Sequence, residues 1–106
     1  MEATNIVVLV TASSAEEAHK ISEQLLKDKL AACVNIIKGI ESLFWWEDKI
    51  DHANETLLVV KTKSSAFKAL TTAVKKAHSY KVPEVIALPI INGNPDYLKW
   101  INESVK

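Results

Sequence analysis

Three short segments of this chain are apolar at every position, so neither face of the strands that they predict can be left in water. They are residues 7–10, 57–60 and 85–88. A strand with one wet face alternates apolar and polar side chains, whereas a continuous, largely β-branched run is typical of a strand buried on both faces. Two helices can cover only one face of a sheet, so the other face needs a partner. The pattern therefore predicts a homo-oligomer.

Two segments between these strands have the signals of amphipathic helices. Ser13 and Ser14 are each followed three residues later by a glutamate, which is the capping-box pattern, and apolar side chains then recur with helical spacing to residue 30. Ser64 and Ser65 are expected to cap a second helix in the same way. Its apolar face consists of Phe67, Leu70, Val74 and Ala77.

A long hairpin is predicted between the two helices. Residues 31–37 lose the helical period and predict a strand, which bends at Gly39 and resumes to residue 47. The polar residues 48–54 are expected to turn the chain. Residues 55–63 then form the return strand.

The last third of the chain predicts one more strand and one more helix. Residues 85–91 form the strand, and Pro89, which has no amide hydrogen to donate, places it at an edge of the sheet. Asn94 is expected to cap a helix that has Pro95 at its first position. The side chains expected to pack inward from this helix are Tyr97, Leu98 and Ile101.

The order of these elements is β-α-β-β-α-β with an additional C-terminal helix, which is the ferredoxin-like pattern. We therefore expect a two-layer α/β (α+β) sandwich. The chain has 106 residues, 48% of them apolar and 25% charged, which fits one globular domain spanning residues 1–106.

Charge and residue usage exclude several classes of function. The 13 basic residues, all lysines, balance 13 acidic ones, which disfavours nucleic-acid binding and phosphate chemistry that depends on arginine. No catalytic motif is present, so we expect no enzymatic activity and no required cofactor. A single cysteine favours a reducing, cytoplasmic location, and the first 14 residues predict neither a signal peptide nor a membrane span.

Few side chains of this chain are candidate metal ligands. Cys33 lies in an apolar strand, where a free cysteine is usually a small buried hydrophobe. His19 and His52 lie among polar residues and have no second ligand one helical turn away. His78 ends the second helix, where the helix dipole favours an imidazolium, so its position has a structural explanation.

Four ordered motifs cover most of the chain and resemble the CutA divalent-cation tolerance family. They are KLAACVN (29–35), SLFWWE (42–47) with Lys49, HSYKVPE (78–84) and NPDYLKWI (94–101). The resemblance implies a ferredoxin-like protomer, assembled by strand pairing into a homotrimer similar to the PII signalling proteins. It also implies a role in metal tolerance.

The resemblance further implies a ligand-binding cleft between subunits. Tyr80 and Glu84 would line it together with Trp46, Glu47 and Lys49 from a neighbouring chain. An alternative function follows from this cleft: a PII-like protein that recognises a small ligand or a protein partner there, without metal.

A divalent metal, copper or zinc, would be held through His78 and Glu84. Family members proposed to bind copper carry a cysteine near the end of the first strand and a second histidine before His78. This chain has Val10 and Ala77 at those positions, and neither can coordinate a metal. Any metal binding is therefore expected to be weak.

Overall fold

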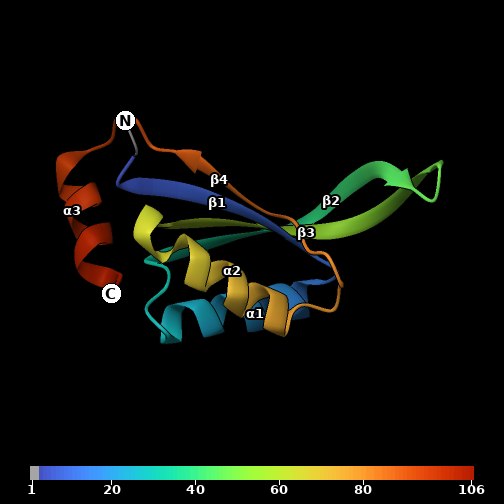
Figure 1. Cartoon of the computed structure of the whole chain (residues 1–106), viewed down its shortest axis with the longest axis horizontal. Helices are drawn as coiled ribbons and strands as arrows, with labels where there is room; N and C mark the ends of the chain where they lie inside the picture. The colour runs from blue at the N-terminus through green and yellow to red at the C-terminus, as the bar shows by residue number, and fades with distance from the viewer. Residues whose placement is uncertain (1–2) are drawn as a thin grey trace.

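A four-stranded antiparallel sheet in the order β2-β3-β1-β4 organises the protein (Figure 1). The computed structural model describes residues 3–106. The elements in this part of the chain are β1 (Asn5–Ala12), α1 (Ala15–Lys27), β2 (Cys33–Trp46), β3 (Lys49–Lys63), α2 (Phe67–Ala77), β4 (Val85–Pro89) and α3 (Pro95–Ser104). This is the predicted ferredoxin-like order, with β4 at the edge as Pro89 indicated.

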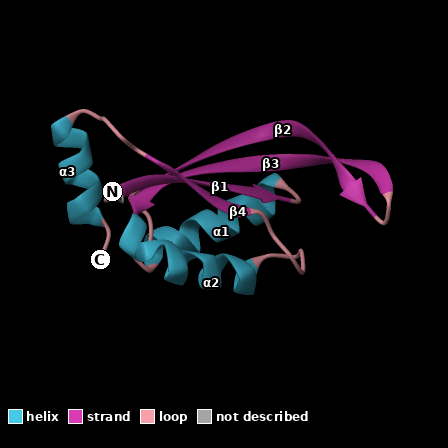
Figure 2. Cartoon of the chain, turned by 45° about the horizontal axis from the view of Figure 1, so that its top comes forward, coloured by secondary structure: helices cyan, strands magenta, loops and turns pink. Residues whose placement is uncertain are grey.

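Helices α1 and α2 lie together on one face of the sheet (Figure 2). Val8 and Val10 of β1 and Leu58 and Val60 of β3 point toward them and are fully buried. The alternate side chains of the same strands face the other side of the sheet, which neither α1 nor α2 covers.

Within residues 3–106 no helix is long and apolar enough to cross a membrane.

Helix α3 closes the end of the sandwich at which β1 begins (Figure 1). Asn94 accepts a hydrogen bond from the Asp96 amide and caps the helix, as predicted. Ile101 is fully buried. The expectation for Tyr97 was wrong: its side chain is 42% exposed, because α3 packs through Ile101.

The hairpin of β2 and β3 extends well beyond the rest of the molecule, and we call its distal part, residues 40–55, the arm (Figure 1). Gly39 has a φ of +72° and marks a bulge between Ile37 and Ile40, as predicted. The expected turn at residues 48–54 was wrong. Strand β3 begins at Lys49, and the turn is only Glu47 and Asp48, both with positive φ.

Two helix and strand boundaries also differ from prediction. Ser64 and Ser65 do not cap α2 with their side chains; they begin a short 3₁₀ turn, Ser64–Ala66, and the Ser64 hydroxyl donates to the Thr4 carbonyl. The last strand ends at Pro89 rather than at residue 91. Helix α1, by contrast, is capped at its N-terminus as predicted, because the Ser14 hydroxyl accepts a hydrogen bond from the Glu17 amide.

Candidate functional site

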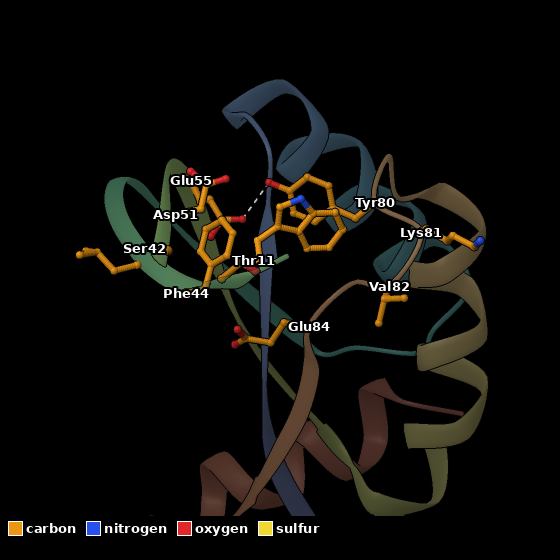
Figure 3. A pocket seen from close by; sticks show the side chains of 11 residues that line it. Thr11, Ser42, Phe44, Asp51, Glu55, Tyr80, Lys81, Val82 and Glu84 are labelled. Carbon is orange, nitrogen blue, oxygen red and sulfur yellow. Dashed lines mark hydrogen bonds between the residues drawn. The ribbon is translucent and has the colours of Figure 1, made fainter. Parts of the chain in front are cut away.

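A cleft of about 810 Å³ lies between the arm and the loop that precedes β4 (Figure 3). The arm contributes Ser42, Phe44, Trp46 and Asp51, and the loop contributes Tyr80, Lys81, Val82 and Glu84. Leu43 and Glu55, also of the arm, and Thr11 of β1 complete the lining. The cleft thus joins two segments that are far apart in the sequence.

Strand alternation explains why all of the arm residues that line the cleft, except Leu43, share one face. Ser42, Phe44 and Trp46 are two residues apart, so their side chains share one face of β2. Asp51 pairs with Phe44 across the hairpin and therefore lies on the same face. The opposite face of the arm carries Trp45 and its cross-strand partner Ile50.

A buried carboxylate lies at the inner end of the cleft. The Glu55 side chain is only 8% exposed, and its Oε2 accepts a 2.8 Å hydrogen bond from the Tyr80 hydroxyl (Figure 3). Burial, together with this bond and the charge of Glu55, raises the pKa of Tyr80 to about 12. Tyr80 therefore remains a neutral hydrogen-bond donor that ties the loop to the arm.

His78 lies beside the cleft and anchors the loop to β1. Its Nε2 is 2.7 Å from the Thr11 carbonyl oxygen, and its Nδ1 is 3.0 Å from the Tyr80 amide nitrogen. A carbonyl only accepts and an amide N–H only donates, so the proton must be on Nε2. Both ring nitrogens are therefore engaged in hydrogen bonds.

Glu17 of α1 holds the same loop from the other side. Its carboxylate accepts hydrogen bonds from the amides of Ser13 and Ser79, at 3.0 and 2.9 Å, and from the Ser13 hydroxyl. Burial alone would raise the pKa of Glu17, but these hydrogen bonds outweigh it and lower the pKa to about 2. The Glu17 carboxylate is thus stabilised in its charged form.

The structure brings together three of the five predicted cleft residues. Trp46, Tyr80 and Glu84 line this cleft within one chain, whereas Glu47 lies in the turn at the tip of the arm and Lys49 is not part of the lining. The cleft between subunits, with Trp46, Glu47 and Lys49 from a neighbouring chain, stays a prediction. Sequence reasoning missed Asp51 and Glu55. The alternation of residues 42–46, with its return strand paired opposite, is the signal that could have placed both.

The proposed metal ligands do not form a preassembled site. Glu84 lines the cleft, but His78 faces Thr11 and, at 3.6 Å, Glu17. Within residues 3–106 no group of three or more histidine, cysteine, aspartate or glutamate side chains is placed to hold a metal ion. Its apolar surroundings in the sequence predicted that Cys33 is fully buried. In the structure Cys33 is only half-buried, because it lies on the edge strand β2.

A ferredoxin-like sandwich with a long hairpin arm and a cleft beside that arm defines the class of this protein. Residues 6–104 match the family described as "CutA1 divalent ion tolerance protein". The chain belongs to this family, as its four motifs indicated.

Relatives from plants and bacteria are similar over most of this chain. The protein "Protein CutA 1, chloroplastic" of Oryza sativa subsp. japonica is 49% identical over 96% of this chain and 58% of its own length. This chain therefore spans a little over half of that relative. "Divalent-cation tolerance protein CutA" of Thermus thermophilus is 46% identical over 92% of this chain and 95% of its own.

A solved structure of the divalent cation tolerance protein Cut A1 from Thermus thermophilus has the same fold. It superposes with a TM-score of 0.95 at 44% identity, covering 96% of this chain and 99% of the other. The name of the rice relative places that protein in the chloroplast.

Proposed function

We propose that this protein is a non-enzymatic homotrimer that acts in divalent-cation tolerance. The uncovered apolar face of the sheet carries the proposal. Ile86 and Leu88 of β4 are about half exposed on this face, and Ile37 of β2 continues it at 46% exposure. A contiguous apolar surface of this kind marks an interaction site in a monomeric chain.

The arm adds a second apolar surface that its own chain does not cover. Trp45 is 74% exposed and its cross-strand partner Ile50 is 67% exposed. Aromatic side chains of this size are typical anchors of protein interfaces. The resemblance to the family supports three copies, with β2 and β4, the two edge strands, available for pairing between chains.

Metal binding by this protein is proposed to be weak. Glu84 is exposed in the cleft and available to a cation, whereas His78 must release a hydrogen bond before it can coordinate one. Imidazole and carboxylate ligands favour zinc or copper(II) over copper(I). Glu84 is therefore the accessible ligand, and His78 can coordinate the same ion only after it loses one of its hydrogen bonds.

An alternative is a PII-like protein that recognises a small ligand or a protein partner at the cleft. The observation in its favour is the volume of about 810 Å³, which is in the range of small-molecule sites. In this alternative the cleft is used without metal. The single cysteine supports a reducing, cytoplasmic location in either case.

Light scattering tests the assembly. We expect a monodisperse trimer at micromolar concentration, about three times the 11.8 kDa of one chain. A monodisperse monomer would contradict the proposal, because one chain cannot cover both faces of its sheet.

Calorimetry with zinc chloride and copper(II) chloride tests the metal sites. We expect weak binding that Glu84→Gln reduces and Cys33→Ser leaves unchanged. His78→Gln should weaken binding less than Glu84→Gln does, because His78 is already engaged. Tight binding that is lost only in Cys33→Ser would overturn the assignment.

A further inference from the structure

The cleft combines aromatic rings with carboxylates. Phe44, Trp46 and Tyr80 supply the rings, and Asp51, Glu55 and Glu84 supply the carboxylates. An aromatic face attracts an ammonium group through its ring quadrupole, and a carboxylate attracts it by charge. The lining therefore has the chemistry of a site for an organic cation.

The negative charge of the cleft is not neutralised within the chain. Lys81 is the one basic residue in the lining, which leaves two net negative charges, and Figure 3 shows its ammonium group directed away from Glu55 and Glu84. The ion pairs within residues 3–106 do not include any of the three cleft carboxylates. A ligand with two positive charges would balance them.

Glu55 has hydrogen-bonding capacity left for a ligand in the cleft. More than nine-tenths of its side chain is buried, yet only one of its carboxylate oxygens accepts a hydrogen bond within residues 3–106. No buried side-chain oxygen or nitrogen of residues 3–106 lacks a partner, so the other oxygen of Glu55 reaches the open cleft. The second oxygen of Glu55 is free to accept from a ligand in the cleft.

The spacing of the carboxylates separates an extended cation from a metal ion. Figure 3 shows Glu55 and Asp51 together on the arm side of the cleft, with Glu84 apart from them in the loop just before β4. The same residues form no group that could hold a metal ion. Two charges carried at separate points of one molecule fit this arrangement better than two charges on one ion.

We propose that the cleft binds a small alkyl diamine, with one ammonium group at Glu55 and Asp51, the other at Glu84, and the alkyl body against Phe44 and Trp46. This inference rests on the use of the cleft as a ligand site, the alternative function given above. It does not require the trimer, because one chain supplies every one of these residues.

Calorimetry of the assembled protein with 1,4-diaminobutane tests the proposal, with n-butylammonium, 1-butanol and zinc chloride as comparison ligands. We expect the diamine to bind about tenfold more tightly than butylammonium, because it forms one more charged hydrogen bond. 1-Butanol should show no measurable binding at the same concentration. Binding of 1-butanol as tight as that of the diamine, or displacement of the diamine by equimolar zinc, would overturn the proposal.

Matched variants locate the site. Glu84→Gln should weaken diamine binding about fivefold, the upper end for an exposed ion pair, and Phe44→Leu should weaken it about threefold through loss of the ring. Glu23→Gln makes the same change of charge on the exposed face of α1 and should alter affinity less than about twofold. An unchanged affinity in Glu84→Gln would place the diamine elsewhere and overturn the proposal.

Light scattering on the same samples keeps this inference separate from the proposed assembly. A trimer that does not bind 1,4-diaminobutane would contradict the diamine site alone. A monomer that binds it, with the loss expected in Glu84→Gln, would support the diamine site while contradicting the trimer.

Discussion

The two halves of the β2–β3 hairpin are paired by the same backbone hydrogen bonds but meet different surroundings. In the body of the sandwich, Leu58 and Val60 are fully buried under α1 and α2. In the arm, Trp45 and Ile50 are paired with each other and mostly exposed. The body is therefore stabilised by its own helices, whereas the apolar side chains of the arm are not covered by their own chain.

The largest effect is expected in the body. Leu58→Ala removes a fully buried side chain from between the sheet and the helices, and we expect it to lower the free energy of unfolding by about 3 kcal/mol. Urea denaturation followed by circular dichroism measures this loss. Val82→Ala, at an 86% exposed position, is the control and should change stability by less than about 0.5 kcal/mol. Equal losses in both variants would contradict the assignment of the core.

The arm should respond in assembly rather than in folding. Trp45→Ala removes an exposed aromatic ring, and we expect it to weaken association by about 2 kcal/mol while the secondary structure stays unchanged. Sedimentation across a dilution series measures the effect. Trp45→Phe keeps an aromatic ring and should lose less. If Trp45→Ala assembles as tightly as wild type, the prediction that the arm contributes to association between chains is wrong.

The smallest effect on stability is expected at Glu17, which holds the loop after α2 through the Ser79 amide. Tyr80 of this loop is in turn hydrogen-bonded to Glu55 of the arm. The folded-state pKa of Glu17 is about 2, below its ordinary value of 4.5, so its contribution is complete above pH 4.5 and is lost as the pH falls toward 2. We expect wild type to be more stable than Glu17→Gln by about 1–2 kcal/mol near neutral pH.

Urea denaturation between pH 6 and pH 2.5 measures this difference for Glu17. The gap between wild type and Glu17→Gln should narrow as the solution is acidified. Glu16→Gln is the matched control, since Glu16 is an exposed neighbour in the same first turn of α1. A gap that stays constant over this range would show that the charge of Glu17 does not stabilise the loop.

Much of the fold could be predicted because it depends on local signals. The Ser14 cap, the bulge at Gly39 and the edge position of Pro89 each follow from the chemistry of a single residue. The turn of the arm could not be predicted in this way. Asp51 and Asn54 are polar residues typical of turns, but long-range pairing with β2 holds both in a strand.

The cleft could be predicted only in part, for a related reason. Tyr80 and Glu84 stood out because the resemblance marked them for a cleft between subunits, and both line the cleft within one chain. Glu55 gave no signal of its own, since its environment depends on Tyr80, which lies 25 residues further along the chain. Contacts over such distances are fixed by the tertiary fold rather than by local pattern.

The position of β1 between β3 and β4 has a consequence for how the chain folds. β1 is made before both of its partners, which follow only at residues 56–63 and 85–89. The β2–β3 hairpin, by contrast, closes over a short loop and can form early. Until β4 emerges, one edge of β1 has no neighbour, and an unpaired apolar edge is the part of a nascent chain most exposed to aggregation.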